Sequence, residues 1–237
     1  MSTSPSKVAK DAKNVKPCLV FELETVAFNG GQAMYEVTEA AFKAREFQLT
    51  PEIFIRFNLS HPTSRVLQHM ATEMEVNLSD IEAMSEEIAE QWQQKLAQSA
   101  PNPVVSKLLG DAAGQGISLG ALTTLPEESA LGLIKALALK VEVALIKLPS
   151  AGCNGRPRQE FWVKLARQMQ VAPAQCVALA GSAPTAQAAV MAGMHVVALP
   201  DTFNAFQDFG GADMVFEKPE ALPLKEIMAL TAPVSRT

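Results

Sequence analysis

The chain has 237 residues, of which 48% are hydrophobic and 19% charged, and its formal net charge is −5 at pH 7. This composition suits one α/β domain with an insertion, or two small domains, and excludes a chain that is disordered throughout. Because no basic face is found on the folded part, nucleic acid is not an expected partner. Charged residues interrupt the most apolar stretch, residues 130–148, so no membrane span is expected.

Residues 1–16 contain the one basic cluster, four lysines, and are expected to form a flexible tail. They lack the apolar run of a signal peptide. The three cysteines, Cys18, Cys153 and Cys176, are widely spaced and form no CxxC motif. We therefore expect a cytoplasmic protein, without a disulfide framework or a zinc site.

A short buried strand is predicted at residues 18–24, and it ends in two carboxylates, those of Glu22 and Glu24. Successive side chains of a strand point to opposite faces, so these two should lie on the same face. In open α/β sheets, ligands bind at the carboxyl ends of the strands. The pair of carboxylates therefore predicts a site, or the remains of one.

From about residue 32 to residue 98 the sequence predicts helices only. Thr50-Pro51-Glu52 gives a cap followed by proline in the first turn, and Ser79-Asp80 begins another helix. The segment 99–103, which contains two prolines, ends the region. We expect a helical domain over 32–98, inserted into an α/β core made of residues 17–31 and 99–237.

Helices and strands alternate in the rest of the chain. The predicted helices are 104–115, 127–139, 160–169 and 185–192, and the predicted strands are 117–122, 141–148, 176–180, 195–199 and 213–216. Such alternation is typical of right-handed βαβ units. It predicts a doubly wound, Rossmann-like parallel sheet that is covered by helices on both faces.

Three local motifs each have two interpretations. Gly181 precedes a helix and Asp201 follows 20 residues later, as in a dinucleotide site, but GxGxxG is absent and tight helix–strand packing explains the small residues equally. The hydroxyl of Thr123 could bind a phosphate oxygen or cap a helix. Arg156 could pair with an anion or lie in a solvated loop.

Taken in chain order, the motifs resemble the haloacid dehalogenase-like superfamily, in its phosphatase and β-phosphoglucomutase-like branch with a helical cap. The resemblance is carried by Phe21-Glu22-Leu23-Glu24, the helical insert, Thr123, the Arg156-Pro157 loop and the segment Ala188-Ala189-Val190-Met191-Ala192-Gly193-Met194. It covers essentially residues 17–230. It implies the doubly wound core and the cap that the patterns predict.

The resemblance also implies a chemistry. Family members carry Asp-x-Asp-Gly-Thr on the first strand, where the first aspartate attacks phosphorus, the second is the acid/base, and Mg²⁺ shields the phosphate. Here Glu22 and Glu24 occupy the two aspartate positions, and Thr25-Val26 replaces Gly-Thr. One extra methylene moves a carboxylate by roughly 1.5 Å, and a misplacement of about 1 Å can cost on the order of 10²-fold in rate.

The remaining motifs are only partly retained. Thr123 matches the phosphate-binding hydroxyl, Arg156 stands where the family has lysine, and the fourth motif's metal-binding acid falls on Gly181, which has no carboxylate. Glu22 is then the one catalytic carboxylate left to bind a metal. We expect a degenerate, catalytically impaired member that binds a small phosphorylated molecule or a protein partner. The alternative is an active Mg²⁺-dependent phosphatase or phosphomutase-like hydrolase of a small phosphorylated metabolite.

Overall fold

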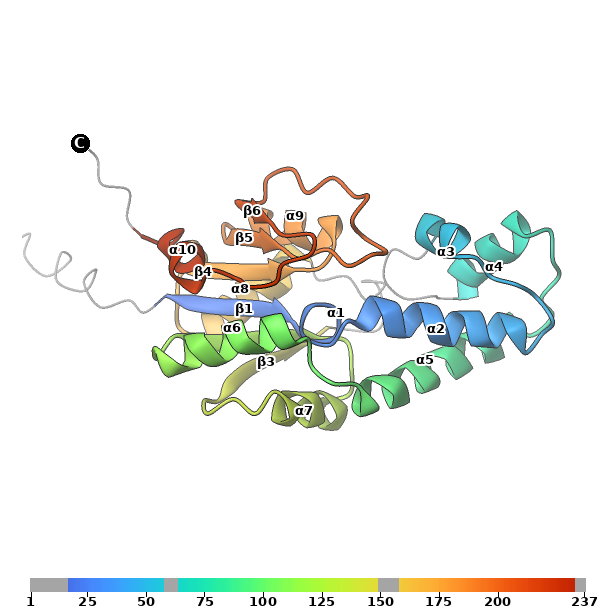
Figure 1. Cartoon of the computed structure of the whole chain (residues 1–237), viewed down its shortest axis with the longest axis horizontal. Helices are drawn as coiled ribbons and strands as arrows, with labels where there is room; N and C mark the ends of the chain where they lie inside the picture. Colours follow the sequence, from blue (N-terminus) through green and yellow to red (C-terminus); the bar gives the residue numbers. More distant parts are fainter. Residues whose placement is uncertain (1–16, 58–63, 149–157, 233–237) are drawn as a thin grey trace, which may run out of the picture.

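The computed structural model describes residues 17–57, 64–148 and 158–232. They form an α/β core and a group of helices that lies beyond the carboxyl end of the central strand (Figure 1). The predicted tail at residues 1–16 and Cys153 lie outside the described residues. In the described part of the chain, no helix is long and apolar enough to cross a membrane.

The described sheet has six strands, all parallel, in the order β3-β2-β1-β4-β5-β6. The strands are β1 (Cys18–Glu22), β2 (Ser118–Thr123), β3 (Val143–Lys147), β4 (Cys176–Ala180), β5 (His195–Ala198) and β6 (Met214–Val215). All five residues of β1 are buried, as expected for a central strand that is covered on both faces. The predicted doubly wound parallel sheet is confirmed.

Two hydrophobic clusters cover the two faces of the sheet. Leu19 and Phe21 of β1 belong to one cluster with α6 (Pro103–Gly114), α7 (Glu127–Ala136) and α10 (Leu224–Ala229). Val20 of β1 belongs to the other cluster with α8 (Gln159–Gln168) and α9 (Ala183–Met191). The alternation of side chains along the strand therefore supplies both cores.

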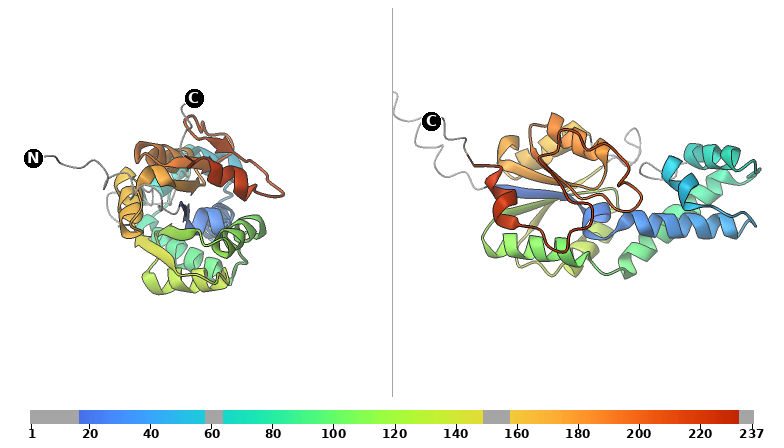
Figure 2. Two further views of the ribbon diagram at one scale, coloured as in Figure 1. Left: turned by 90° about the vertical axis from the view of Figure 1, so that its left-hand side faces the viewer. Right: turned by 45° about the horizontal axis from the view of Figure 1, so that its top comes forward.

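Beyond the short helix α1 (Leu23–Ala27), the described residues form helices α2 to α5 before the chain returns to the core, and we call these helices the helical insertion (Figures 1 and 2). They are α2 (Gly30–Lys43), α3 (Pro51–Phe57), α4 (Ser64–Glu73) and α5 (Ile81–Gln98). Their apolar interior is continuous with the cluster on the α6 face of the sheet. The insertion and the core therefore share buried surface.

The insertion begins and ends at two neighbouring asparagines. The side-chain amide of Asn102 donates to the Asn29 side chain at 3.0 Å, and the backbone N–H of Asn102 donates to the carbonyl of Ala27 at 2.7 Å. Asn102 also caps α6 by accepting from the N–H groups of Val104 and Val105. The chain therefore leaves the core and returns to it at one point.

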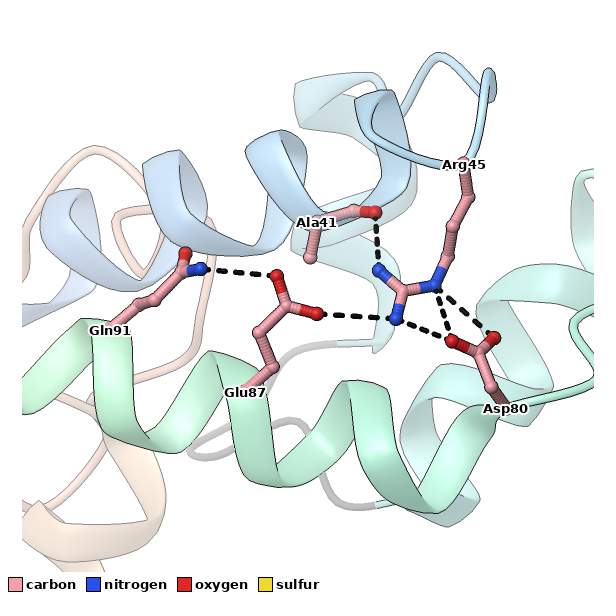
Figure 3. A network of polar contacts seen from close by, with 5 residues as sticks. All are labelled: Ala41, Arg45, Asp80, Glu87 and Gln91. Carbon is pink, nitrogen blue, oxygen red and sulfur yellow. Dashed lines mark hydrogen bonds and ion pairs between the residues drawn. The ribbon is translucent and has the colours of Figure 1, made fainter.

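Arg45 holds the far ends of α2 and α5 together (Figure 3). Its guanidinium donates to the carbonyl of Ala41, to both oxygens of Asp80 at 2.6–3.2 Å, and to Glu87 at 3.2 Å. The Arg45 side chain is only 18% exposed. A fork-shaped guanidinium with several partners fixes relative orientation better than a single ion pair does.

The structure corrects the prediction for the first strand. β1 ends at Glu22, and Leu23–Ala27 forms the short helix α1. Pairing with β4 stops at Phe21 and pairing with β2 stops at Glu22, so the next backbone groups form local helical hydrogen bonds instead. The alternation rule of a strand therefore does not apply to Glu24. Helix α10 was not predicted.

Candidate functional site

The candidate site lies where the winding of the sheet changes direction. β1 lies between β2 and β4, and β2 leads outward to β3 while β4 leads outward to β5. Ligands of doubly wound folds bind at such a switch point, beyond the carboxyl ends of the strands. Glu22 is the last residue of β1, and Glu24 lies in the first turn of α1 directly after it. Both side chains are buried.

One oxygen of Glu24 receives four donors from the end of β2. The Thr123 hydroxyl lies 2.5 Å from Glu24 Oε1, and the Thr124 and Leu125 N–H groups donate to the same oxygen at 2.7 and 3.1 Å. The Thr124 hydroxyl adds a contact of 3.2 Å. We call these groups the β2 donor cluster. Two backbone N–H groups and two hydroxyls that converge on one point form an oxyanion-binding arrangement.

Glu22 faces the opposite neighbouring strand. Its Oε2 accepts the N–H of Gly181, the residue directly after β4, at 2.7 Å. Burial raises the pKa of Glu22 to about 7, and the Gly181 N–H and the Thr185 hydroxyl oppose this shift. Near neutral pH the side chain is therefore partly protonated.

The pKa of Glu24 is also raised by burial, against the lowering effect of the hydrogen bond from Thr123. The two carboxylates are close enough for the charge of Glu24 to raise the pKa of Glu22 further. The structure therefore brings together Glu22 with Gly181, and Glu24 with Thr123. Arg156, the predicted anion-binding residue, lies outside the described residues.

Gly181 is in close contact with α1. A Cβ atom at this position would lie 3.3 Å from Oγ1 and 3.4 Å from Cβ of Thr25, and 3.5 Å from a methyl of Val26. Thr25 stands where the resembled family has glycine, and Gly181 stands where that family has an acid. A side chain at position 181 would therefore be in tight contact with Thr25, which would have to shift by a few tenths of an ångström.

The residues present do not fit a Mg²⁺ site. Position 181 supplies no carboxylate, and one oxygen of Glu24 is already bonded to the β2 donor cluster. In the described ranges, no group of three or more histidine, cysteine, aspartate or glutamate side chains could hold a metal ion. Mg²⁺ requires near-octahedral oxygen ligands at about 2.0–2.1 Å.

A cavity of about 480 Å³ lies beside α1. It is lined by Thr25, by Asn29 and Asn102 at the two ends of the insertion, and by residues 199–203, 205 and 216–219. This volume falls in the range of small-molecule pockets, about 300–1,000 Å³. Asp201 and Lys218 provide charged groups of both signs in its wall.

The residues of the dinucleotide alternative have other partners. Oδ1 of Asp201 accepts from the N–H of Phe203 at 2.9 Å and from the side-chain amide of Asn204 at 2.8 Å. At the start of α9, the N–H of Ala183 donates to the side chain of Gln207 at 2.7 Å. Hydrogen bonds within the chain therefore engage Oδ1 of Asp201 and the N–H of Ala183.

Sequence reasoning missed the acceptor of the β2 donor cluster. The phosphate-binding role of Thr123 stays a prediction, and in the structure its hydroxyl donates to Glu24. Sequence reasoning also missed the two N–H groups of Thr124 and Leu125. The adjacent threonines at a strand end were the one available signal of this cluster. Backbone N–H groups could not be recognised from the sequence, because nearly every residue type has one.

Comparisons with known proteins found similarity in structure only. No protein-family model matches the chain, and no curated protein matches it in sequence. The hydrolase of haloacid dehalogenase family IA, variant 3, from Entamoeba histolytica matches with a TM-score of 0.70 at 12% identity, over 91% of this chain and 99% of that one.

Two further solved structures agree. CbbY from Rhodobacter sphaeroides, in complex with phosphate, has a TM-score of 0.66 at 17% identity, over 85% of this chain and 94% of that one. A putative β-phosphoglucomutase from Thermotoga maritima has a TM-score of 0.64 at 18% identity, over 90% and 97%. These matches confirm the fold that the sequence motifs imply.

The buried position of Glu22 predicts a specific pH dependence of stability. The folded chain holds this proton up to a pH of about 7, whereas the ordinary pKa is 4.5, so stability should fall as pH rises between these values. The effect is on the order of 3 kcal/mol. Glu22→Gln should remove this pH dependence. The free energy of unfolding in urea, measured for the variant relative to the parent protein, should therefore be higher at pH 8 than at pH 5.

Glu82→Gln, which changes an exposed carboxylate of α5, serves as the control and should leave the pH profile unchanged. Parallel profiles for Glu22→Gln and the parent protein would contradict a raised pKa at Glu22.

The contact between Gly181 and Thr25 predicts that a metal site cannot be rebuilt by acids alone. In the triple variant Glu22→Asp, Glu24→Asp, Gly181→Asp, the new side chain at position 181 still lies against Thr25. Its Cβ atom would be 3.3 Å from Oγ1 of Thr25. Adding Thr25→Gly should give measurable Mg²⁺ binding by calorimetry, and the triple variant should bind at least about tenfold more weakly. Equal binding by both variants would show that Thr25 is no obstacle.

Proposed function

Since the chain has the fold of the haloacid dehalogenase-like hydrolases, we propose that it is a catalytically impaired protein of this fold that acts by binding a small ligand or a protein partner. One observation carries the proposal: the carboxylate of Glu24 fills the β2 donor cluster. In the resembled family the corresponding hydroxyl binds the phosphate. Here an anionic group of the chain itself takes that place.

The occupied cluster opposes phosphoryl transfer in two ways. A phosphate oxygen would have to displace Glu24 Oε1 from four donors at 2.5–3.2 Å, which are short and well aligned. While Oε1 stays bonded to these donors, only Oε2 of Glu24 could act as acid/base on a substrate. Preorganised donors accelerate a reaction only when they face the charge that develops in the transition state.

The state of Glu22 supports the same proposal. A nucleophilic carboxylate must be ionised, and burial raises the pKa of this one to about 7. A carboxylate at position 181 would help to hold Mg²⁺, which supplies positive charge. Without it, little positive charge would balance Glu22, Glu24 and a phosphate dianion in one buried site. The cavity of about 480 Å³ beside α1 leaves room for a small ligand.

A second candidate function is an active Mg²⁺-dependent phosphatase or phosphomutase-like hydrolase. It is favoured by the similar structures, because CbbY is known in complexes with phosphate and with xylulose-1,5-bisphosphate. In this function Glu22 would be the nucleophile and Glu24 the acid/base, and Thr123 and Arg156 would hold the phosphate. The substrate would be a small phosphorylated molecule.

A phosphatase screen separates the two functions. With Mg²⁺ and a panel of sugar phosphates, sugar bisphosphates and phosphoglycolate, we expect no phosphate release above the level of Glu22→Gln. Glu82→Gln, on the exposed face of α5, controls for contaminating enzymes and for handling. Turnover that Glu22→Gln abolishes and Glu82→Gln preserves would refute catalytic impairment and favour the hydrolase.

Emptying the β2 donor cluster should create an anion site. Glu24→Ala removes the internal acceptor, so millimolar inorganic phosphate should raise the thermal midpoint of this variant but not of the parent protein. Glu24→Gln is the matched control, because its amide oxygen can still accept from Thr123 and from the Thr124 and Leu125 N–H groups. Equal stabilisation of all three proteins by phosphate would contradict the blocking role of Glu24.

A further inference from the structure

A turn of the core inserts an aromatic ring between two helices of the insertion. Phe203 follows β5, and its ring centroid lies 5.2 Å from that of Tyr35 in α2 and 5.2 Å from that of Phe54 in α3. Tyr35 and Phe54 are themselves 5.2 Å apart, so the three rings form a closed triangle. Phe203 is 7% exposed and Phe54 is fully buried. We call these three residues the aromatic triangle.

The ring pairs have favourable geometry. Phe54 meets both partners edge-to-face, with interplanar angles of 75° and 76°, and Tyr35 and Phe203 are stacked at 29°. Aromatic pairs prefer such offset or T-shaped arrangements at centroid separations of 4.5–7 Å. The triangle is therefore a directional contact between core and insertion, in addition to their shared apolar surface.

The turn that carries Phe203 is held in shape by Asp201. Oδ1 of Asp201 accepts from the N–H of Phe203 and from the side-chain amide of Asn204, and its backbone carbonyl accepts from the N–H groups of Asn204 and Ala205. These bonds fix the direction of the Phe203 side chain before it meets the insertion.

Asp201 also lies directly against the first turn of α2. A Cβ atom at Gly31 would lie 1.9 Å from Oδ2 of Asp201, so this close approach requires a residue without a side chain. The turn therefore contacts the insertion twice, through Gly31 near the start of α2 and through the ring of Phe203 between α2 and α3.

Helices α2 and α5 of the insertion are joined to each other at two places. Arg45 joins α2 to Asp80 and Glu87 at the start of α5 (Figure 3). Near the other end of α5, the indole N–H of Trp92 donates to the carbonyl of Gly30 at 3.1 Å. A contact that fixes α2 therefore also fixes α5.

We infer that Phe203 is a positioning residue of the core, which fastens the helical insertion in one orientation over the end of the sheet. The turn 201–205 lines the cavity beside α1 together with Asn29 and Asn102. By holding the insertion in place, this turn sets the width of that cavity. This inference concerns the position of the insertion alone, and it holds whether the protein is a binding protein or a hydrolase.

The test uses the whole chain labelled with 5-fluorotryptophan. It contains two tryptophans, Trp92 in the insertion and Trp162 in α8 of the core, and Trp162→Phe assigns the two fluorine resonances. Phe203→Ala should shift or broaden the Trp92 resonance and leave Trp162 unchanged. Hydrogen exchange of α2 and α5 should become faster by on the order of tenfold, and exchange of α8 should not change.

Two variants of the same turn serve as comparisons. Phe206 is 59% exposed, and in the described residues its ring contacts no other ring, so Phe206→Ala should change neither resonance. Phe203→Tyr keeps the ring and should restore the Trp92 resonance towards that of the parent protein. General destabilisation would instead speed exchange in α8 and in the insertion alike.

A second test, Gly31→Ala, keeps the ring of Phe203. Gly31→Ala places a methyl against Asp201 and should displace the turn from α2, reproducing the Trp92 change of Phe203→Ala. Phe203→Leu, which keeps most of the volume, replaces Phe203→Ala if that variant does not fold. An unchanged Trp92 resonance and unchanged exchange in α2 and α5, in folded Phe203→Ala or Phe203→Leu and in Gly31→Ala, would overturn the inference.

Discussion

The hydrogen bonds between Glu24 and the end of β2 determine how the chain leaves the sheet. They join α1 to a strand that is 99 residues away in the sequence. Without such an anchor, a buried carboxylate would be unsatisfied at a high cost in free energy. With it, α1 turns directly out of β1, and α2 starts from Gly30 in a fixed direction.

The residues of the site are physically coupled to one another. Thr25 packs beside Gly181, and the N–H of Gly181 donates to Glu22. The longer side chains of Glu22 and Glu24 reach backbone donors on the two strands that flank β1. Each of these residues thus supplies a contact or a hydrogen-bond partner to another, so the buried polar groups of the site satisfy one another.

Much of the fold could be predicted from the sequence, because apolar runs bounded by turn residues specify the strands of a buried parallel sheet. Cys176–Ala180 was predicted with the bounds that the structure has. Helix α1 could not be predicted, since it depends on where the partners of β1 stop pairing. The acceptor of the β2 donor cluster and the ring contacts of Phe203 are likewise tertiary facts, set by residues far apart in the chain.

The hydrogen-bonded pair of Asn29 and Asn102 has a consequence for the history of such a chain. The insertion leaves the core and returns to it at one point, so its two ends are as close together as those of a closed loop. The entropy of closing a loop grows only slowly with length, by about 0.6 kcal/mol for each doubling. The entropic cost to the core of extra residues at this point is therefore small, whereas removing the insertion would expose the apolar surface that the two share. Contacts such as the aromatic triangle are then what distinguishes an added segment from an integrated one.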